Sequence, residues 1–471
     1  MPSSGIPRPA TLGELRESGW ESVPVKEELR RNAVARIVAG EPMFPGVLGY
    51  EDTVLPQLEN ALLAGHDVIF LGERGQAKTR MIRALVGLLD EALPIVFGSE
   101  INDDPFNPVS AHARAAIAEH GDATPISWIG QDQRFGEKLA TPDTSIADLI
   151  GEVDPIKVAE GRYLSDELTL HYGLVPRTNR GIFAINELPD LAERIQVGLL
   201  NVLEERDVQV RGYKVRLPLD IYLVASANPE DYTNRGRIIT PLKDRFGSQI
   251  RTHYPLDVET EVAIAEQEST PFAVPGLRVS VPPFLADVVA TLSHLARQSP
   301  HVNQRSGVSV RLTVANQETL VANAARRALR LGETDVVPRI IDLEALASST
   351  QGKIEIESVD EGRDGQVVEH LLRAAVLTVF RDRLPIDRLR PVLEAFEGGE
   401  VVHTGEDVTA ATEAALVERI PALREPVLEL TGGDESPAAI ASAVEFVLEG
   451  LHLSKRLNKD AAAGKATYRG R

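Results

Sequence analysis

Short apolar runs alternate with helix-like segments between residues 67 and 254, and this pattern is typical of a parallel α/β sheet. The runs that we predict as strands are residues 68–71, 94–97, 182–186, 221–226 and 250–254. Ahead of this region, an apolar residue recurs at every fourth position from Val25 to Ile37, and Gly40 follows. This spacing predicts an amphipathic helix that ends at the glycine.

Helical periodicity dominates the rest of the chain. Phe284, Val288 and Leu292 illustrate it, and the mainly helical pattern is interrupted by a Gly/Glu-rich turn at residues 397–400. We therefore divide the chain into four parts. These are an N-terminal extension at 1–40, an α/β core at 41–255, an all-helical lid at 256–355 and a helical C-terminal extension at 356–471.

The C-terminal end is basic, although the chain as a whole is acidic. Its last 18 residues carry six Lys or Arg side chains and one Asp, a net charge of +5. For such a segment we favour a solvated, disordered terminus, and the alternative is a docking tail.

A glycine-containing loop follows the first predicted strand and opens a helix with apolar residues at Ile82, Leu85 and Leu88. Small residues let backbone N–H groups surround phosphate oxygens, and the start of a helix adds partial positive charge. The arrangement therefore predicts a phosphate-binding loop. Lys78 is expected to reach the β- and γ-phosphates of a nucleotide, and the Thr79 hydroxyl to hold Mg²⁺. The loop consists of Gly72, Glu73, Arg74, Gly75, Gln76, Ala77, Lys78 and Thr79.

A second apolar strand, about 100 residues downstream, ends in Asn186 and Glu187. In a P-loop ATPase we expect such a strand to lie beside the first and to present an acidic pair to the metal and the attacking water. Glu187 is placed to orient or activate that water. Asn186 stands where aspartate is expected; its amide can accept a hydrogen bond from a metal-bound water but lacks the charge of a carboxylate. Either hydrolysis is slow, or the site compensates for the missing charge elsewhere.

Three further residues follow in the order that such a site requires. Asn228 ends another apolar strand, where it is placed to position the hydrolytic water between Glu187 and the γ-phosphate. Arg245 lies at the end of a predicted helix, from which it can point at the nucleotide of a neighbouring subunit. Arg311 begins a helix in the all-helical segment and can close onto the γ-phosphate from the same chain.

These motifs resemble those of the AAA+ ATPases of the helix-2-insert group, which include the small (I) subunit of magnesium chelatase and the MoxR-type ATPases. The resemblance covers about residues 41–350. The segments that carry it are residues 104–108, 172–182, 227–230 and 244–247. Ala77, where the usual phosphate loop has glycine, is similar to what MoxR-type members often contain.

The resemblance implies a P-loop AAA+ fold with ATP and Mg²⁺ as ligands. The motifs that it implies are Walker A at residues 72–79, Walker B at 182–187, sensor 1 at Asn228, an arginine finger at Arg245 and sensor 2 at Arg311. It also implies a helix-2 insert at 146–161 and a presensor-1 hairpin at 208–217, which in the family face the ring pore and the partner protein. For residues 208–217, an edge hairpin without a contact role is the alternative. After about residue 350 we find no counterpart in the family.

Composition narrows the function further. Lys and Arg total 50 and Asp and Glu 70, a net charge of -20, which disfavours nucleic-acid binding because that binding neutralises phosphates with Lys and Arg. The chain has no Cys, which excludes disulfides, thiolate metal sites and Cys nucleophiles. No apolar stretch reaches the ~20 residues of a membrane span, and no secretory signal is visible, so we expect a cytoplasmic protein.

We therefore expect an ATP-hydrolysing enzyme that couples hydrolysis to the remodelling or activation of a protein partner. By family resemblance it assembles into a homo-oligomeric ring, a hexamer in the simplest case, and its partner is a von Willebrand A-domain protein encoded elsewhere. One alternative is the ATPase subunit of a magnesium or cobalt chelatase. Another is a nucleotide-gated scaffold with weak hydrolysis because of Asn186. A transcription activator is disfavoured because no DNA-binding helix pair is evident.

Overall fold

The computed structural model describes the chain in seven stretches that form two compact units. The stretches are residues 8–153, 170–204, 217–228, 236–304, 306–356, 364–462 and 464–471. The first unit is Met1–Glu73 with Ala77–His253, and the second is Tyr254–Arg471 with Arg74–Gln76. Within the described stretches, no helix is both long and apolar enough to cross a membrane.

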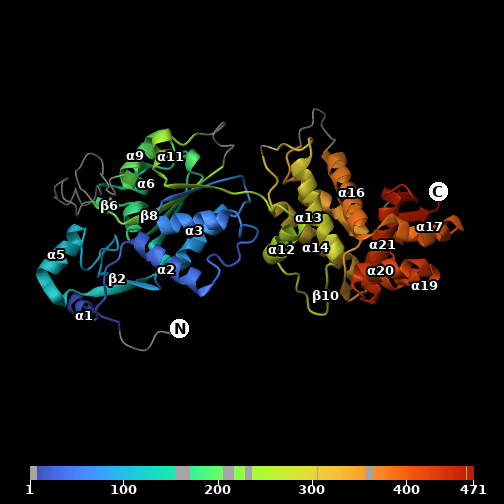
Figure 1. Ribbon diagram of the computed structural model, residues 1–471, viewed down its shortest axis with the longest axis horizontal. Helices are drawn as coiled ribbons and strands as arrows, with labels where there is room; N and C mark the ends of the chain where they lie inside the picture. Colours follow the sequence, from blue (N-terminus) through green and yellow to red (C-terminus); the bar gives the residue numbers. More distant parts are fainter. Residues whose placement is uncertain are drawn as a thin grey trace. The chain divides into compact units, whose positions relative to one another are not determined.

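A five-stranded parallel sheet forms the centre of the first unit (Figure 1). Its order is β4-β7-β8-β1-β9. The strands are β1 (Val68–Leu71), β4 (Phe135–Leu139), β7 (Gly181–Asn186), β8 (Ile221–Ala227) and β9 (Ser248–Arg251). β1, β7 and β8 are buried along their whole length, as expected for parallel strands covered on both faces. Four of the five predicted runs thus fall on strands of this sheet.

The fifth predicted run, at residues 94–97, is wrong as a strand of this sheet. Residues Ala92–Val96 form β2, which pairs antiparallel with β3 (Ile126–Gly130) in a separate two-stranded sheet. The edge of the main sheet is instead occupied by β4, whose residues are half-buried or exposed. Because β4 contains no continuous apolar run, its sequence gives little signal of a strand.

The strand that ends in Asn186 does not lie beside β1, contrary to the prediction. β8 lies between them and pairs with β1 on one side and with β7 on the other. Each parallel connection crosses over through a helix, so order along the chain does not reveal which strand is inserted between two others. The carboxyl ends of β1, β8 and β7 therefore follow one another along a single edge of the sheet.

Helices cover both faces of the sheet. The described helices of the first unit are α1 (Leu12–Glu17), α2 (Val25–Ala39), α3 (Val54–Ala64), α4 (Lys78–Ala84), α5 (Ala111–His120), α6 (Ile146–Leu149), α8 (Leu174–Arg177), α9 (Glu193–Glu204) and α11 (Thr240–Arg245). Val68 and Phe70 share one buried cluster with α2, α3 and α4, whereas Ile69 and Leu71 share another with α6, α9 and α11. Side chains alternate along a strand, so each face receives every second residue. α2 confirms the predicted N-terminal helix and packs in this core.

The second unit is mainly helical. Its helices are α12 (Val258–Glu268), α13 (Pro283–Gln298), α14 (Arg311–Leu331), α15 (Leu346–Gln351), α16 (Asp364–Arg383), α17 (Arg390–Glu397), α18 (Ala410–Ala414), α19 (Leu416–Arg419), α20 (Arg424–Thr431) and α21 (Pro437–Leu453). Its strands are β10 (Arg278–Val279), β11 (Asp335–Val336), β12 (Val401–Gly405), β13 (Asn458–Ala462) and β14 (Lys465–Arg469).

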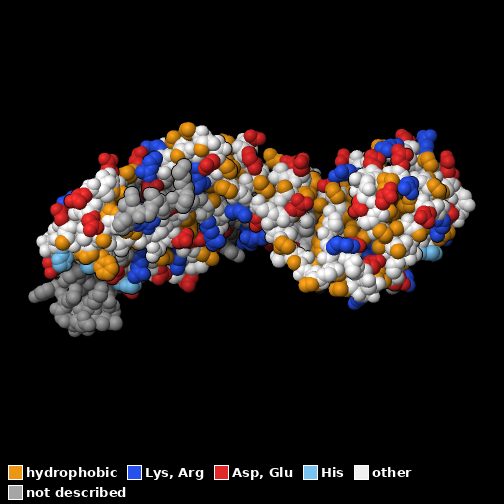
Figure 2. Space-filling model, turned by 90° about the horizontal axis from the view of Figure 1, so that it is seen from below, with side chains coloured by type: hydrophobic (Ala, Val, Ile, Leu, Met, Phe, Trp, Pro, Cys, Tyr) orange, Lys and Arg blue, Asp and Glu red, His pale blue; other side chains and the backbone are white. Residues whose placement is uncertain are grey.

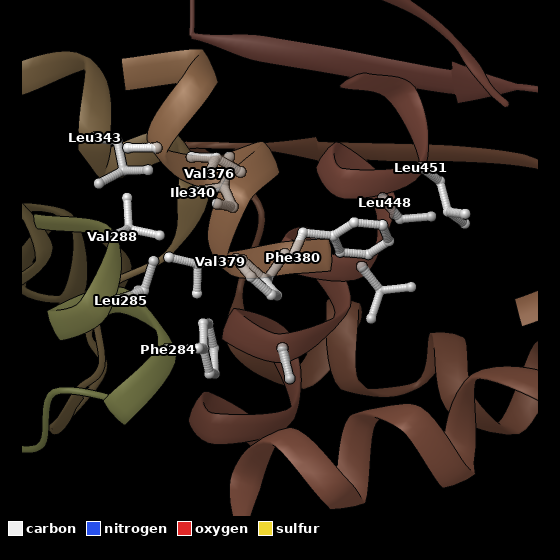
Figure 3. Close-up of a cluster of buried hydrophobic side chains, with 14 of the residues drawn as sticks. Phe284, Leu285, Val288, Ile340, Leu343, Val376, Val379, Phe380, Leu448 and Leu451 are labelled. Carbon is white, nitrogen blue, oxygen red and sulfur yellow. The ribbon is translucent and has the colours of Figure 1, made fainter. Parts of the chain in front are cut away.

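One hydrophobic core joins the residues on both sides of position 355 in this unit. Figure 3 shows Phe284, Leu285 and Val288 of α13 beside Val376 and Val379 of α16, and the Phe380 ring of α16 directed towards Leu448 of α21. The helices pack closely: a Cβ at Gly450 of α21 would lie 2.0 Å from the Phe380 ring. The predicted lid and C-terminal extension therefore share a core, and the boundary between them at 355 stays a prediction.

The basic C-terminal end forms a β-hairpin, so the prediction of a disordered terminus is wrong. β13 and β14 pair antiparallel, and β14 also pairs with β12. Tyr468 is buried and donates its hydroxyl to Glu449 of α21 at 2.6 Å, and Lys459 donates to the same carboxylate at 2.7 Å. Lys459, Lys465 and Arg469 of this segment thus have acidic partners in the fold, a feature that their charge in the sequence does not reveal.

Charges on the surface and in the interior are arranged differently. On the face that Figure 2 shows, acidic and basic side chains are interspersed rather than gathered into one basic stripe. In the interior, Arg134 donates to Glu28 at 2.6 Å and Arg327 to Asp342 at 2.9 Å. Burying a charge is costly unless it is paired, so these ion pairs compensate for much of that cost.

Glu261 of α12 is expected to stabilise the second unit in a pH-dependent way. Its buried carboxylate accepts from Arg297 at 2.8 Å and lies 2.9 Å from His294. Burial raises the pKa of Glu261, but the hydrogen bonds of His294 and Arg297 outweigh it and leave the pKa below the ordinary 4.5. A carboxylate whose pKa is lowered by folding contributes stability above its unfolded pKa and loses it as the pH falls through the folded value.

We therefore expect Glu261→Gln to lower the free energy of unfolding by about 3 kcal/mol at pH 7, because Arg297 loses its buried partner. The difference from the wild type should shrink as the pH falls below 4.5. Urea denaturation at neutral and acidic pH measures both effects. Asp335→Asn, which breaks an exposed pair with Arg278, is the control and should change little. An equal difference at both pH values would contradict this assignment.

Candidate functional site

The loop after β1 starts at the carboxyl end of that strand and leads directly into α4. The Gly72 N–H donates to the carbonyl of Ala227, at the end of β8, at 3.1 Å. Gly75 and Ala77 have positive φ angles of 73° and 52°. A residue with a Cβ adopts this left-handed conformation at a cost of about 1 kcal/mol. The backbone at position 77 therefore favours glycine, which agrees with the usual pattern of a phosphate loop.

Lys78, the first residue of α4, turns its side chain back into this loop. The side chain is buried, and Nζ donates to the carbonyl oxygens of Gly72 at 2.6 Å and Glu73 at 2.7 Å. Its positive charge therefore lies where a phosphate loop would receive a nucleotide. The other loop residues are Thr79, which is half-buried in the first turn of α4, Arg74, which is exposed, and Gln76, which is buried.

Asn186 lies at the carboxyl end of β7 and is buried. Its Nδ2 donates to Oε1 of Glu137 at 2.6 Å, and its Oδ1 accepts from Oγ of Ser226 at 3.0 Å. Glu137 is in β4 and Ser226 is in β8, so the amide is held from the two strands that flank β7. Glu137 also accepts from Nε of Arg83 in α4 at 2.8 Å.

Sequence reasoning missed both partners of this amide. Ser226 interrupts an otherwise apolar strand near its carboxyl end. A polar residue at such a position indicates a candidate site residue. Glu137 gives a weaker signal, since it is one of several charged residues in a half-polar segment. Only the pairing of β4 with β7 brings it next to Asn186.

Glu187 and Asn228 follow β7 and β8 at the same edge of the sheet. Glu187 has a left-handed backbone with φ 55°, and its N–H donates to Oγ of Ser226 at 3.2 Å. Ser226 therefore contacts both residues of the Asn186–Glu187 pair. Asn228 is buried and directly follows β8, whose last residue, Ala227, accepts the hydrogen bond from the Gly72 N–H. The structure thus brings the loop, the Asn186–Glu187 pair and Asn228 to neighbouring strand ends.

The two candidate arginines lie in different units. Arg245 is the last residue of α11 in the first unit and is exposed. Arg311 is the first residue of α14 in the second unit and is also exposed. Both helix positions agree with the sequence prediction, and the proposed roles of these arginines stay predictions.

Within the segment 172–182, which carries part of the family resemblance, two polar residues stabilise the fold and do not lie at the candidate site. Asn179 and Arg180 precede β7, at the end opposite to Asn186. Asn179 donates to the carbonyl of Ile101 at 3.0 Å, and Arg180 donates to that of Pro94 at 2.8 Å. These hydrogen bonds tie the start of β7 to neighbouring loops.

The two predicted protrusions are only partly described. Of the segment 146–161, α6 and β5 (Gly151–Val153) are described, and β5 pairs antiparallel with β6 (Leu170–Tyr172). Residues 154–161 of that insert lie outside the described residues, as does the segment 208–216 of the predicted hairpin. The roles of both protrusions stay predictions.

The side chains at the sheet edge are suited to Mg²⁺ that arrives with a nucleotide. In the described part of the chain, no group of three or more His, Cys, Asp or Glu side chains could hold a metal ion. Mg²⁺ prefers oxygen ligands and is commonly bound by one or two protein groups together with phosphates and water. The Thr79 hydroxyl and the Asn186 carbonyl are oxygen donors of this kind, so the donor set fits.

Comparison with known proteins places these residues in a family context. A family profile described as the Sigma-54 interaction domain matches residues 160–245. The chain is 31% identical over 244 residues to the magnesium-chelatase 38 kDa subunit of Rhodobacter capsulatus, with 49% of this chain and 61% of that protein covered. It is 33% identical over 245 residues to the magnesium-chelatase subunit ChlI of Guillardia theta, with 48% and 63% covered. The chain thus spans less than two thirds of the length of these relatives.

Among solved structures, the complex between subunits BchI and BchD of magnesium chelatase matches with 24% identity and a TM-score of 0.37, covering 70% of this chain and 98% of that chain. The curated relatives confirm the resemblance to the I subunits of magnesium chelatase. The parallel sheet flanked by helices confirms the predicted α/β fold class.

Proposed function

We propose that this chain binds ATP with Mg²⁺ at the loop of residues 72–79 and hydrolyses it. The observation that carries the proposal is the buried Lys78 ammonium, which is hydrogen-bonded inside a loop between a parallel strand and a helix. Backbone N–H groups and a lysine in such a loop provide the positive charge that phosphates require. The relationship to magnesium-chelatase subunits supports the same activity.

The neighbouring residues have distinct roles in this proposal. Thr79 and Asn186 hold the Mg²⁺ that accompanies the nucleotide, Asn186 through a metal-bound water. Glu187 orients a water molecule and accepts its proton as the water oxygen attacks the γ-phosphorus and the bond to the ADP oxygen breaks. Asn228 positions the same water from the end of β8.

Replacing Lys78 by alanine tests the nucleotide site. Loss of charged hydrogen bonds to the phosphates should weaken ATP binding by about 10- to 100-fold. Titration with a fluorescent ATP analogue measures the affinity. Lys138→Ala, a change of a half-buried lysine on β4, is the matched control and should leave it unchanged. Equal affinities of Lys78→Ala and the wild type would refute the site.

We further propose that the ATPase works as a homo-oligomeric ring, a hexamer by family resemblance, that remodels or activates a protein partner. Arg245 would then complete the site of the neighbouring subunit. Light scattering with and without nucleotide measures the assembly. The Glu187→Gln variant, which should bind ATP without hydrolysing it, is suited to capture the partner, including a von Willebrand A-domain protein.

A second candidate function is the ATPase subunit of a metal chelatase. It is favoured by the names of the relatives, which are magnesium-chelatase subunits. In that function ATP hydrolysis would drive insertion of Mg²⁺ or Co²⁺ into a tetrapyrrole. An insertion assay with candidate partner subunits distinguishes it from protein remodelling.

A nucleotide-gated scaffold is the remaining alternative, and it depends on Asn186. Under this alternative the missing carboxylate makes hydrolysis negligible, so Asn186→Asp should raise kcat strongly. A compensated enzyme would show no such rise. The contact of Glu137 with Asn186 favours the compensated enzyme.

A further inference from the structure

The carboxylate of Glu137, on the neighbouring strand β4, contacts Asn186, which stands where an aspartate is expected. Oε1 of Glu137 accepts from Nδ2 of Asn186 at 2.6 Å. An ionised carboxylate only accepts hydrogen bonds, so the amide nitrogen must face Glu137. The amide oxygen then faces the opposite way, where it accepts from Ser226 at 3.0 Å. Glu137 therefore determines the orientation of the Asn186 amide.

The strand register and the helix after the phosphate loop hold Glu137 in this place. Glu137 pairs with Ala184, two residues before Asn186, and residues two apart on a strand lie on the same face. Arg83 of α4 donates from Nε to Oε2 of Glu137 at 2.8 Å and from Nη2 to Oε1 at 3.1 Å. Arg83 lies four residues after Thr79, one turn along the same helix face. The carboxylate is thus fixed between the helix that begins at the loop and the end of β7.

We propose that Glu137 is a positioning residue that compensates for the amide at position 186. It directs the carbonyl oxygen of Asn186 towards the metal-bound water and restores a negative charge beside the Mg²⁺ site. The inference rests on the proposed function, since it concerns the metal that accompanies the nucleotide. Aspartate at position 186 would face Glu137 as a second carboxylate at hydrogen-bond distance, and such like charges oppose each other. Asn186 and Glu137 therefore act as a matched pair.

The test measures Mn²⁺ binding to the full chain saturated with ADP, by electron paramagnetic resonance. We expect Glu137→Gln to weaken Mn²⁺ affinity by about 10-fold or more, as loss of such an outer partner does in other metal sites. The double variant Glu137→Gln/Asn186→Asp returns the carboxylate to position 186 with glutamine as its hydrogen-bond donor. It should recover an affinity within about threefold of the wild type.

Glu91→Gln is the matched control, because Glu91 is an exposed glutamate directly before β2, away from the contacts that hold Asn186. The Mn²⁺ affinity of this variant should change by less than about threefold. Wild-type affinity in Glu137→Gln would overturn the inference, as would a double variant that binds Mn²⁺ no better than Glu137→Gln.

Binding of ADP without metal separates this inference from the proposed function. A wild-type protein that binds no ADP would refute the nucleotide site itself. A wild-type protein that binds ADP and Mn²⁺, with Glu137→Gln equal to it, would refute only the role of Glu137. Should Glu137→Gln fail to fold in a thermal melt, the double variant carries the test alone: recovered affinity supports the matched pair, and lost affinity refutes it.

Discussion

Replacing Arg245 by alanine is expected to lower ATP hydrolysis by about 10³-fold or more, because an arginine that stabilises the transferring phosphoryl group contributes about 10³–10⁵ in rate. The structure supports an outward-facing role for this side chain. Leu242 and Phe246 are buried on either side of Arg245 and anchor the end of α11 in the core, while Arg245 itself is exposed. A fixed backbone with an exposed guanidinium is suited to contact a second subunit.

The measurement is steady-state ATP hydrolysis by assembled protein, with ATP affinity measured separately. Binding should change little, because the proposed contact acts on the transition state of a neighbouring site. Arg237→Ala is the control, since Arg237 is an arginine near the start of α11 that is 77% exposed. It should retain the wild-type rate.

Mixing two inactive variants tests whether Arg245 acts between subunits. In a ring of Arg245→Ala and Lys78→Ala subunits, some interfaces combine an intact loop from the first variant with an intact Arg245 from the second. Partial recovery of hydrolysis is therefore expected. No recovery from a mixture that assembles, or full activity of Arg245→Ala alone, would contradict the role between subunits.

Glu187→Gln is expected to lower kcat by about 10²- to 10⁴-fold, the usual contribution of a general base, while ATP binding is retained. Glu187 holds a left-handed backbone at φ 55° directly after β7, and its N–H donates to Ser226. Residues in this conformation are uncommon and concentrate at functional sites, where the surrounding contacts enforce them. Glu187 therefore lies directly after β7, at the end of the sheet where the phosphate loop follows β1.

Single-turnover hydrolysis and ATP affinity are the two measurements for this variant. Glutamine keeps the size and one carbonyl oxygen of the side chain but cannot accept a proton, so chemistry should be lost without loss of binding. Glu193→Gln, at the exposed start of α9, is the control. An unchanged single-turnover rate in Glu187→Gln would remove Glu187 from the reaction.

The sequence predicts those parts of the candidate site whose pattern lies within a short stretch of residues. The loop from Gly72 to Thr79 lies between a buried strand and a helix as expected, and Arg245 and Arg311 occupy the predicted ends of helices. Ala77 departs from the glycine of the usual loop pattern, and its positive φ explains why glycine is preferred at this position. Glu137 was missed, because its relevance depends on a strand pairing that connects residues 49 positions apart.

The sequence by itself determined the elements whose signal is contained in a short stretch. Four apolar runs, the helix that ends at Gly40 and the phosphate loop are set by nearby residues, since burial, helix capping and loop conformation act over a few positions. The tertiary structure alone decided that β8 separates β1 from β7, that β4 brings Glu137 to Asn186, and that the basic C-terminus pairs as a hairpin. The first two features, and the pairing of the C-terminal hairpin with β12, depend on which distant segments pack together. That choice follows from the packing of the whole chain rather than from any local pattern.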